Sequence, residues 1–266
     1  MPGPVVAGRV RVALGHLRKA RAALRQDPLD AKALHAFRKQ ARRTWAAVQL
    51  TEAYLTPVQF ARVGRFAAPL AGGLGRLRDE DVLAKRLAAL ARGKSKPLQD
   101  DLLGALRRLP AAERKRRVAR AVARAKPKRI DRPVAEALTS MRKGWLDPLG
   151  LARARLRERS RWVSAASSVE ALHALRLELK AYRYAVEALG KEASRLDTLA
   201  AAQARKAAKV LGRVMDAHAL AGLAATARPR AAKTLRAAAR RDAEAARSEF
   251  GKGWTGGWPA LRQVVL

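Results

Sequence analysis

The sequence contains no cysteine, so it holds no disulfide bond and no thiolate metal site. Aromatic residues make up only 5% of its 266 residues, which disfavours a core built from β-strands. Uncharged runs are short as well. The longest covers residues 217–227, and eleven residues are too few for a helix that spans a membrane. Residues 1–21 lack an apolar signal core followed by a cleavage site, so we expect a cytoplasmic protein.

Acidic residues are scarce. The chain has 22 Asp and Glu against 57 Lys and Arg, which gives a net charge of +35. Charge of this size says little about the fold, but it predicts a polyanionic partner. Nucleic acid, inorganic polyphosphate and an anionic membrane are the three candidates. The length suits one large domain or two small ones and is sufficient to bury a core.

Alanine, leucine and arginine dominate the sequence, and all three favour helix. No clear alternation of apolar and polar residues indicates a strand, so we predict an all-α protein. Proline and glycine mark the expected breaks between helices. These breaks lie at residues 27–28, 57, 69–73, 93–97, 110, 126–133, 147–148, 190 and 228–229.

One helical pattern occurs twice, each time with a histidine near its start. Residues 34–48 read LHAFRKQARRTWAAV, and residues 172–186 read LHALRLELKAYRYAV. The chain has only four histidines, so this match indicates the duplication of a structural unit. At an offset of 138 residues, the pattern pairs His35 with His173, Arg38 with Arg176, and Arg42 with Lys180.

A second block repeats at almost the same spacing. LGRLRDEDVL at 74–83 aligns with LGRVMDAHAL at 211–220, at an offset of 137 residues. Each half therefore carries a histidine helix followed by an LGR-x-x-D segment. We expect a single domain over residues 1–266, with a first repeat over about 5–130, a second over about 131–250, and a C-terminal tail over 251–266.

The cations of the histidine helices fall on one face. Given about 100° of rotation per residue, His35, Arg38 and Arg42 form a narrow stripe beside the apolar face of their helix. Their counterparts in the second repeat do the same and are joined by Arg183. Charges at the edge of a core are partly desolvated and interact strongly with a counter-charge. The aspartates of the two LGR-x-x-D segments are candidate internal counter-charges, and a phosphate chain is the candidate external one.

Each of these features also has a purely structural interpretation. A single histidine at the edge of a core is usually a hydrogen-bonded packing residue, whereas two in register with the same flanking cations favour a shared ligand. The LGR-x-x-D segments fit a structural Arg–Asp pair at a helix start as well as a ligand role. Trp45, Tyr182 and Tyr184 are expected to pack in or beside the core.

One charge run stands apart from the repeats. Residues 113–132 carry ten Lys or Arg and two Asp or Glu, in a pattern that predicts a basic amphipathic helix. A solvated face or a linker is the commoner origin of such a run. An extension of an anion-binding surface and a contact with acidic lipid are the alternatives.

These motifs resemble those of the CHAD family, the conserved histidine α-helical domain. The resemblance rests on LHAFRKQARR, LHALRLELKAYRY, LGRLRDEDV and LGRVMDAHA, and it covers nearly the whole chain. It implies an all-α fold of two helical bundles related by pseudo-twofold symmetry, with a basic central surface or pore that binds inorganic polyphosphate. It also implies association with polyphosphate granules or with polyphosphate-metabolising enzymes.

The resemblance further implies which residues contact polyphosphate, taken from matching positions in both halves. The symmetry is imperfect, because Ala181 stands at the position equivalent to Arg43. Met215 likewise stands at the position equivalent to Arg78. The implied contact set comprises His35, Arg38, Arg42, Arg43, Arg76, Arg78, His173, Arg176, Lys180, Arg183, Lys206, Lys209 and Arg213.

The sequence thus predicts a non-enzymatic module that binds inorganic polyphosphate through many cations at once. Binding would release the counterions condensed on a linear polyanion. No catalytic residue, metal site or cofactor is expected. Protonated histidines would add hydrogen-bond donors, so binding should strengthen as the pH falls.

Two alternatives remain open from the sequence. A nucleic-acid-binding protein is supported by charge alone, since no recognised nucleic-acid-binding motif is present. An enzyme acting on phosphoanhydrides would need a metal or a phosphate-binding loop. Asp79, Glu80 and Asp81 form the nearest approach to a metal site, and the second repeat does not preserve it.

Overall fold

The structure is a computed structural model, and it describes residues 3–72, 74–106, 109–124, 132, 134–136, 138–139 and 147–265, without the side chains of 66–72, 76, 78 and 124. Throughout this part of the chain the regular structure is helical, with no strand. The α-helices are α1 (Gly3–Gln26), α2 (Ala31–Gln49), α3 (Pro57–Gly72), α4 (Gly75–Ala91), α5 (Lys96–Gly104), α6 (Ala111–Arg124), α8 (Gly150–Ser160), α9 (Val169–Leu189), α10 (Arg195–Ala224), α11 (Pro229–Lys252) and α12 (Pro259–Val265). Short helical turns are η1 (Glu52–Tyr54), η2 (Gly190–Glu192) and η3 (Gly253–Gly257).

Polar side chains fix the starts of the helices that carry the repeats. The carboxylate of Asp30 accepts hydrogen bonds from the backbone N–H of Lys32 and Ala33 at the start of α2. The Ser168 hydroxyl accepts from the Ala171 N–H at the start of α9, at 3.2 Å. Each such cap contributes about 1 kcal/mol, so the two histidine helices begin at well-defined residues.

Most of the expected breaks separate helices as predicted, and one does not. Pro57 begins α3, Pro229 begins α11, and Gly190 ends α9 with a φ of 62° that favours glycine. Pro69 lies inside α3, which continues to Gly72. The breaks expected at residues 126–131 and at 133 lie outside the described residues.

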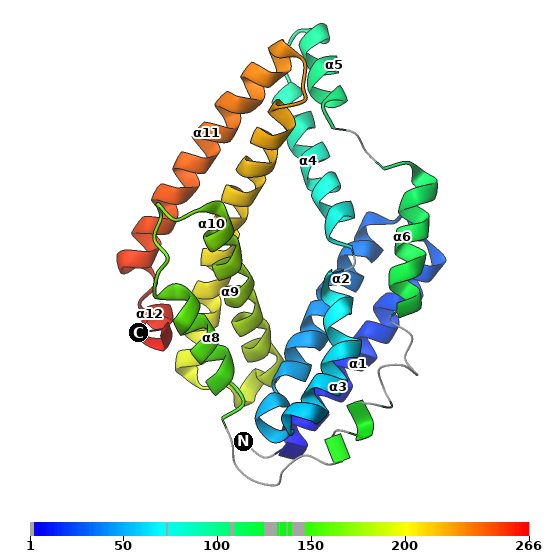
Figure 1. The fold of residues 1–266 in the computed structure, drawn as a ribbon, viewed down its shortest axis with the longest axis vertical. Helices are drawn as coiled ribbons and strands as arrows, with labels where there is room; N and C mark the ends of the chain where they lie inside the picture. The colour runs from blue at the N-terminus through cyan, green and yellow to red at the C-terminus, as the bar shows by residue number, and fades with distance from the viewer. Residues whose placement is uncertain are drawn as a thin grey trace.

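The helices are arranged as a diamond with two sides (Figure 1). The first half supplies α1, α2, α3 and α6 on one side, and the second half supplies α8 to α12 on the other. The sides meet at two places. Near one end α2 packs against α9, and at the other end α4 and α5 pack against α10 and α11.

Each side has its own apolar core. In the first half, Val10, Phe37 and Leu77 are buried together, whereas Leu172 and Leu211 belong to a separate cluster in the second half. A third cluster joins the two halves: Leu87 of α4 and Leu102 of α5 pack with Leu220 of α10 and Leu235 of α11. Each fully buried leucine contributes about 1.5–3 kcal/mol, so this third cluster is a substantial link.

The aromatic residues pack as expected. Tyr182 and Tyr184 are buried, and the ring of Trp45 stacks on that of Phe60 with centroids 6.3 Å apart. The segment beyond residue 250 is folded onto the second half, where Trp258 and the side chains of α12 join its core. Among the described helices, none is long and apolar enough to cross a membrane.

A buried carboxylate ties α8, α9 and α10 together. Asp197 of α10 is 2% exposed and accepts hydrogen bonds from Arg153 (Nε, 3.0 Å), Tyr182 (Oη, 2.8 Å) and Ser194 (Oγ, 2.6 Å). Burial pushes the pKa of Asp197 upward, but these hydrogen bonds outweigh it and leave the pKa below its ordinary value. Burial and the adjacent carboxylate raise the pKa of Tyr182. This network holds α9 in place beside α10.

Candidate anion-binding surface

The two histidine helices lie side by side. Their C-terminal halves are in contact, and each helix reaches into the core of the other half. Ala188 of α9 packs against the first-half core, and Leu50, at the end of α2, belongs to the second-half core. Two cationic stripes that lie 138 residues apart in the sequence are therefore carried by neighbouring helices.

The members of the two stripes are graded in exposure in the same way. His35 and His173, at the helix starts, are exposed. One helical turn further along, Arg38 is buried and Arg176 is half-buried, and the cations after them, Arg42 and Lys180, are half-buried. The exposed and half-buried members are the ones placed to reach a ligand from solvent.

The innermost arginine of each stripe binds the backbone of the helix that carries the LGR-x-x-D block. In the first half, Nη1 of Arg38 donates to the carbonyl oxygens of Leu74 and Gly75. In the second half, Nε of Arg176 donates to the carbonyl of Ala208 at 3.2 Å. These are charge-assisted bonds that fix the histidine helix against α4 or α10.

Glycine in the second block leaves room for this arginine. A Cβ atom at Gly212 would lie 3.4 Å from Nε of Arg176, in van der Waals contact with the guanidinium group. The repeated arginine thus holds the histidine helix against the LG dipeptide itself in the first half and against the preceding turn of α10 in the second half. The ligand role predicted for Arg38 and Arg176 stays a prediction, alongside this observed contact with the backbone.

Arg43 of α2 and Arg183 of α9 meet at one carboxylate. Glu187 of α9 forms ion pairs with Arg43 at 3.0 Å and with Arg183 at 3.2 Å. The Arg183 guanidinium carbon also lies 4.1 Å from the centroid of the Tyr184 ring. These two predicted contact residues, which come from different halves, are thus brought together by the fold.

Three further predicted residues lie on one face of α10. Lys206, Lys209 and Arg213 are exposed and, with Lys252 of α11, line a cavity of about 640 Å³ beside η3. Glu249 of α11 is the acidic residue of this cavity and pairs with Arg213. The cavity therefore carries an excess of positive charge.

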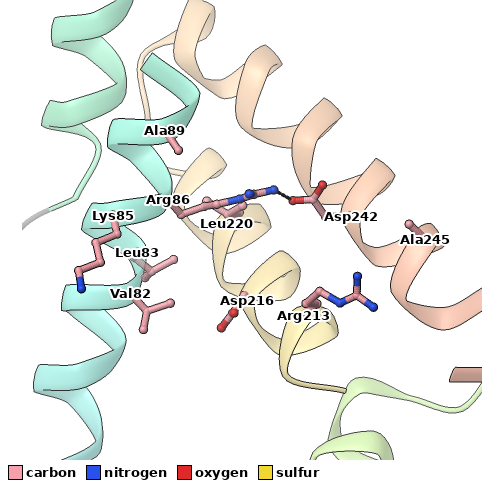
Figure 2. Close-up of a pocket in the computed structure, with 10 residues that line it drawn as sticks. All are labelled: Val82, Leu83, Lys85, Arg86, Ala89, Arg213, Asp216, Leu220, Asp242 and Ala245. Carbon is pink, nitrogen blue, oxygen red and sulfur yellow. Dashed lines mark hydrogen bonds and ion pairs between the residues drawn. The ribbon is translucent and has the colours of Figure 1, made fainter. Parts of the chain in front are cut away.

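A second cavity, of about 500 Å³, lies between α4, α10 and α11 (Figure 2). Arg86 of α4 reaches across it and pairs with Asp242 of α11. Arg213 and Asp216, from the second LGR-x-x-D block, line it from α10. Three cations and two carboxylates line this cavity, so its excess of positive charge is smaller than that of the first.

The corresponding positions of the first block are only partly described. The side chains of Arg76 and Arg78 lie outside the described residues, so their predicted role stays a prediction. Asp79 is exposed. The carboxylate of Glu80 accepts hydrogen bonds from Arg114 (Nη1, 3.2 Å) and from the Leu109 N–H (3.3 Å).

Asp81 completes this contact with Arg114, at 3.0 Å. The acidic run considered as a metal site is thus used in part to dock α6, the start of the basic run 113–132, onto α4. Within the described part of the chain, no group of three or more His, Asp or Glu side chains is placed to hold a metal ion.

Several charged residues near these surfaces were not predicted from the sequence. Glu187 is one of them, although its i+4 spacing from Arg183 indicates an ion pair. Lys252 and Arg86 lie outside both repeated blocks, and only the packing of α11 and α4 against α10 brings them to the two cavities. No pattern in the sequence indicates that packing.

Comparison with known proteins agrees with this arrangement. The family model of the CHAD domain matches residues 9–225. The chain belongs to the CHAD family. Among solved structures it is similar to PptA from Streptomyces chartreusis, with a TM-score of 0.64 and 22% sequence identity, over 96% of this chain and 99% of that one. This likeness concerns the fold alone. Comparison with curated proteins gives no significant match.

Proposed function

We propose that this CHAD protein binds inorganic polyphosphate through the cationic face formed by α2, α9 and α10. The observation that carries the proposal is the side-by-side placement of the two histidine helices, each with exposed or half-buried cations on equivalent positions. Membership of the CHAD family and the net charge of +35 support it.

The chemistry of the surface suits a linear chain of phosphates. Arginine binds phosphate oxygens in a bidentate manner, and lysine adds a compact charge. Individual exposed ion pairs contribute only about 0–1 kcal/mol, so tight binding needs many of them on a rigid support. The caps, the Asp197 network and the anchors at Arg38 and Arg176 supply that rigidity.

Polyphosphate fits the surface better than nucleic acid does. Base recognition in single strands relies on exposed aromatic side chains. Near the two stripes the aromatic residues are withdrawn: Tyr182 and Tyr184 are buried, and Trp45 is half-buried against Phe60. A binding or scaffolding module for polyphosphate granules or polyphosphate metabolism is the biological role that we infer for this surface.

The direct test is calorimetric titration of the whole protein with long-chain polyphosphate and, in parallel, with duplex DNA at equal phosphate concentration and near-physiological salt. We expect tighter binding of polyphosphate. Equal affinity for the two polyanions would mean that net charge alone governs binding, and would overturn the assignment.

A matched pair of variants locates the surface. The first combines Arg42→Ala, Lys180→Ala, Lys206→Ala and Lys209→Ala, and leaves the anchoring arginines intact. The second removes the same charge from exposed positions elsewhere, through Lys115→Ala, Arg120→Ala, Arg236→Ala and Arg240→Ala. We expect the first variant to lose at least tenfold more polyphosphate affinity than the second. Equal losses would place binding on a diffuse charge instead.

A further inference from the structure

A third cavity lies in the second half, and none of its lining residues belongs to the histidine helices. It has a volume of about 480 Å³ and is lined from α8, from the turn that follows α8, from η3 and from α12. Its charged lining residues are Arg157, Arg161 and Arg262, and no acidic residue lines it. The other cavities described above contain at least one carboxylate, so this one is distinct in its charge.

The surrounding sequence supplies little counter-charge. Residues 251–266 contain no Asp or Glu, and Glu158 is the one acidic residue of α8. Glu158 is exposed and does not line the cavity. Three guanidinium groups around one hollow repel one another, and a bound anion relieves that repulsion.

The walls of the cavity are firmly held. Nη2 of Arg157 donates to the carbonyl of Val264 at 3.5 Å, and Nη1 of Arg262 donates to the carbonyl of Thr255 at 2.5 Å. These bonds leave the other guanidinium donors of both arginines available to a ligand. Arg161 is exposed. Its backbone N–H donates to the Arg157 carbonyl at 3.1 Å, so its place at the end of α8 does not depend on its guanidinium group.

An aromatic surface borders the arginines. Trp254 of η3 lines the cavity, is half-buried, and stacks on Phe250 with centroids 5.3 Å apart, which fixes the plane of its ring. Trp162, beside Arg161, is 83% exposed. In a chain with 5% aromatic residues, two indole rings thus lie on or beside the segments that carry the three arginines.

We propose that this hollow, which we call the α8–α12 pocket, binds a nucleoside polyphosphate such as a nucleoside triphosphate. Its arginines contact the phosphates and the Trp254 ring stacks on the base. The volume of about 480 Å³ lies within the range of pockets that bind small ligands, about 300–1,000 Å³, so its size suits a mononucleotide. Arginine forks and base–aromatic stacking supply the two parts of the recognition.

The experiment compares ATP with inorganic triphosphate by calorimetry at low salt. The two ligands share the phosphoanhydride chain, and only ATP has a base. We expect ATP to bind at least fivefold more tightly than triphosphate, and Arg161→Ala with Arg262→Ala to weaken ATP binding at least tenfold. Arg236→Ala with Arg240→Ala is the control of equal charge. Arg161→Glu serves as a second variant, since the place of Arg161 at the end of α8 does not depend on its guanidinium group.

Tryptophan fluorescence tests whether the base of ATP stacks on Trp254. ATP should quench the emission of the unmodified protein, and Trp254→Phe should abolish most of that quenching while circular dichroism stays unchanged. The inference is overturned by equal affinity for ATP and triphosphate, by quenching that survives Trp254→Phe, or by tighter binding of a single-stranded oligonucleotide that depends on Trp162. Variants at Arg42 and Lys180 distinguish this inference from the proposed polyphosphate binding. Their alanine variants should bind ATP normally, whatever the result with polyphosphate.

Discussion

Equivalent arginines in the two halves carry a charge that the fold uses for its own assembly. Arg38 binds two backbone carbonyls at the start of α4, and Arg176 binds one on α10, in both cases through a charged donor. The cations one turn further along keep their exposure. A single stripe thus contains a buried or half-buried arginine that binds the backbone and, one turn further along, a cation that is open to solvent. The difference between them follows from how close each lies to the next helix.

The shared carboxylate of Glu187 leads to a prediction about affinity. Replacing it by glutamine removes the counter-charge that occupies Arg43 and Arg183. If both arginines contact the ligand, polyphosphate affinity should rise about threefold to tenfold, which corresponds to about 0.7–1.4 kcal/mol. The measurement is calorimetry with long-chain polyphosphate. Glu158→Gln is an equal change of charge at an exposed site on α8, outside the stripes, and should have a smaller effect. Equal effects would contradict the role of Glu187.

The buried Asp197 makes stability depend on pH. Its folded-state pKa lies below that of an unfolded aspartate, which is about 3.9, so folding favours the ionised form. The resulting stabilisation is complete at neutral pH and is lost as the pH falls below about 4 and through the folded-state pKa. Asp197→Asn should therefore be less stable than the unmodified protein at pH 7, and the gap should narrow toward pH 3. Urea denaturation at several pH values measures it, and a gap that stays constant with pH would contradict the prediction.

At the scale of helices, charge decides where α6 lies. Arg114 is 15% exposed and Glu80 is 7% exposed, so their contact is largely removed from water. The apolar side chains Val118 and Val122 of α6 pack into the first-half core, and Nε of Arg21 donates to the Val122 carbonyl at 2.9 Å. The part of the basic run that the structure describes as α6 is thus an anchored helix with exposed cations.

Removing the Arg114 contact should loosen α6. Arg114→Ala leaves the Glu80 carboxylate buried with one of its donors missing, and breaking such a pair costs about 3 kcal/mol or more. Hydrogen exchange should therefore show faster exchange in residues 111–124, together with a lower free energy of unfolding. Lys115→Ala, on the exposed face of the same helix, should change neither. Unchanged protection in Arg114→Ala would mean that the apolar contacts alone hold α6.

The boundaries of the helices could be predicted from the sequence better than the contacts between them. Proline, glycine and the capping residues act locally, so the starts of α3 and α11 and the end of α9 could be placed in advance. Pro69 was the exception, since a helix can continue past a proline when packing favours it. The contact between α2 and α9 was not predicted, because it depends on how whole bundles fit together. The buried position of Arg38 was missed for the same reason: its helical angle placed it at the edge of the core, and the approach of α4 covered it.

At the scale of the molecule, the two halves are joined at separate ends of the diamond (Figure 1). One junction is the contact between α2 and α9. The other combines the third apolar cluster with ion pairs from Arg86 to Asp242 and from Arg228 to Asp101. This double connection holds the cations of α2, α9 and α10 in a constant relative arrangement, which binding to an extended ligand requires.

The dependence of polyphosphate affinity on salt concentration measures how many phosphates these cations neutralise. For single-stranded nucleic acid, the slope of log K against log salt is roughly 0.7 per neutralised phosphate, and polyphosphate is a comparable linear polyanion. The variant that lacks the cations at 42, 180, 206 and 209 should therefore show a slope shallower by roughly 3. Titrations at four or more salt concentrations give the slope. A steep slope retained by this variant would show that other cations carry the contact.

The third apolar cluster also affects the order in which parts of the chain fold during synthesis. Leu87 and Leu102 emerge from the ribosome more than a hundred residues before Leu220 and Leu235, with which they pack. The apolar face of α4 and α5 therefore stays exposed until α10 and α11 have been synthesised, while the first-half core can form early. Contacts between residues so distant in sequence are slow to form, and the waiting surface is prone to aggregation. We infer that α4 and α5 are the last helices to reach their native packing. They are also the helices that most need protection from aggregation in the cell.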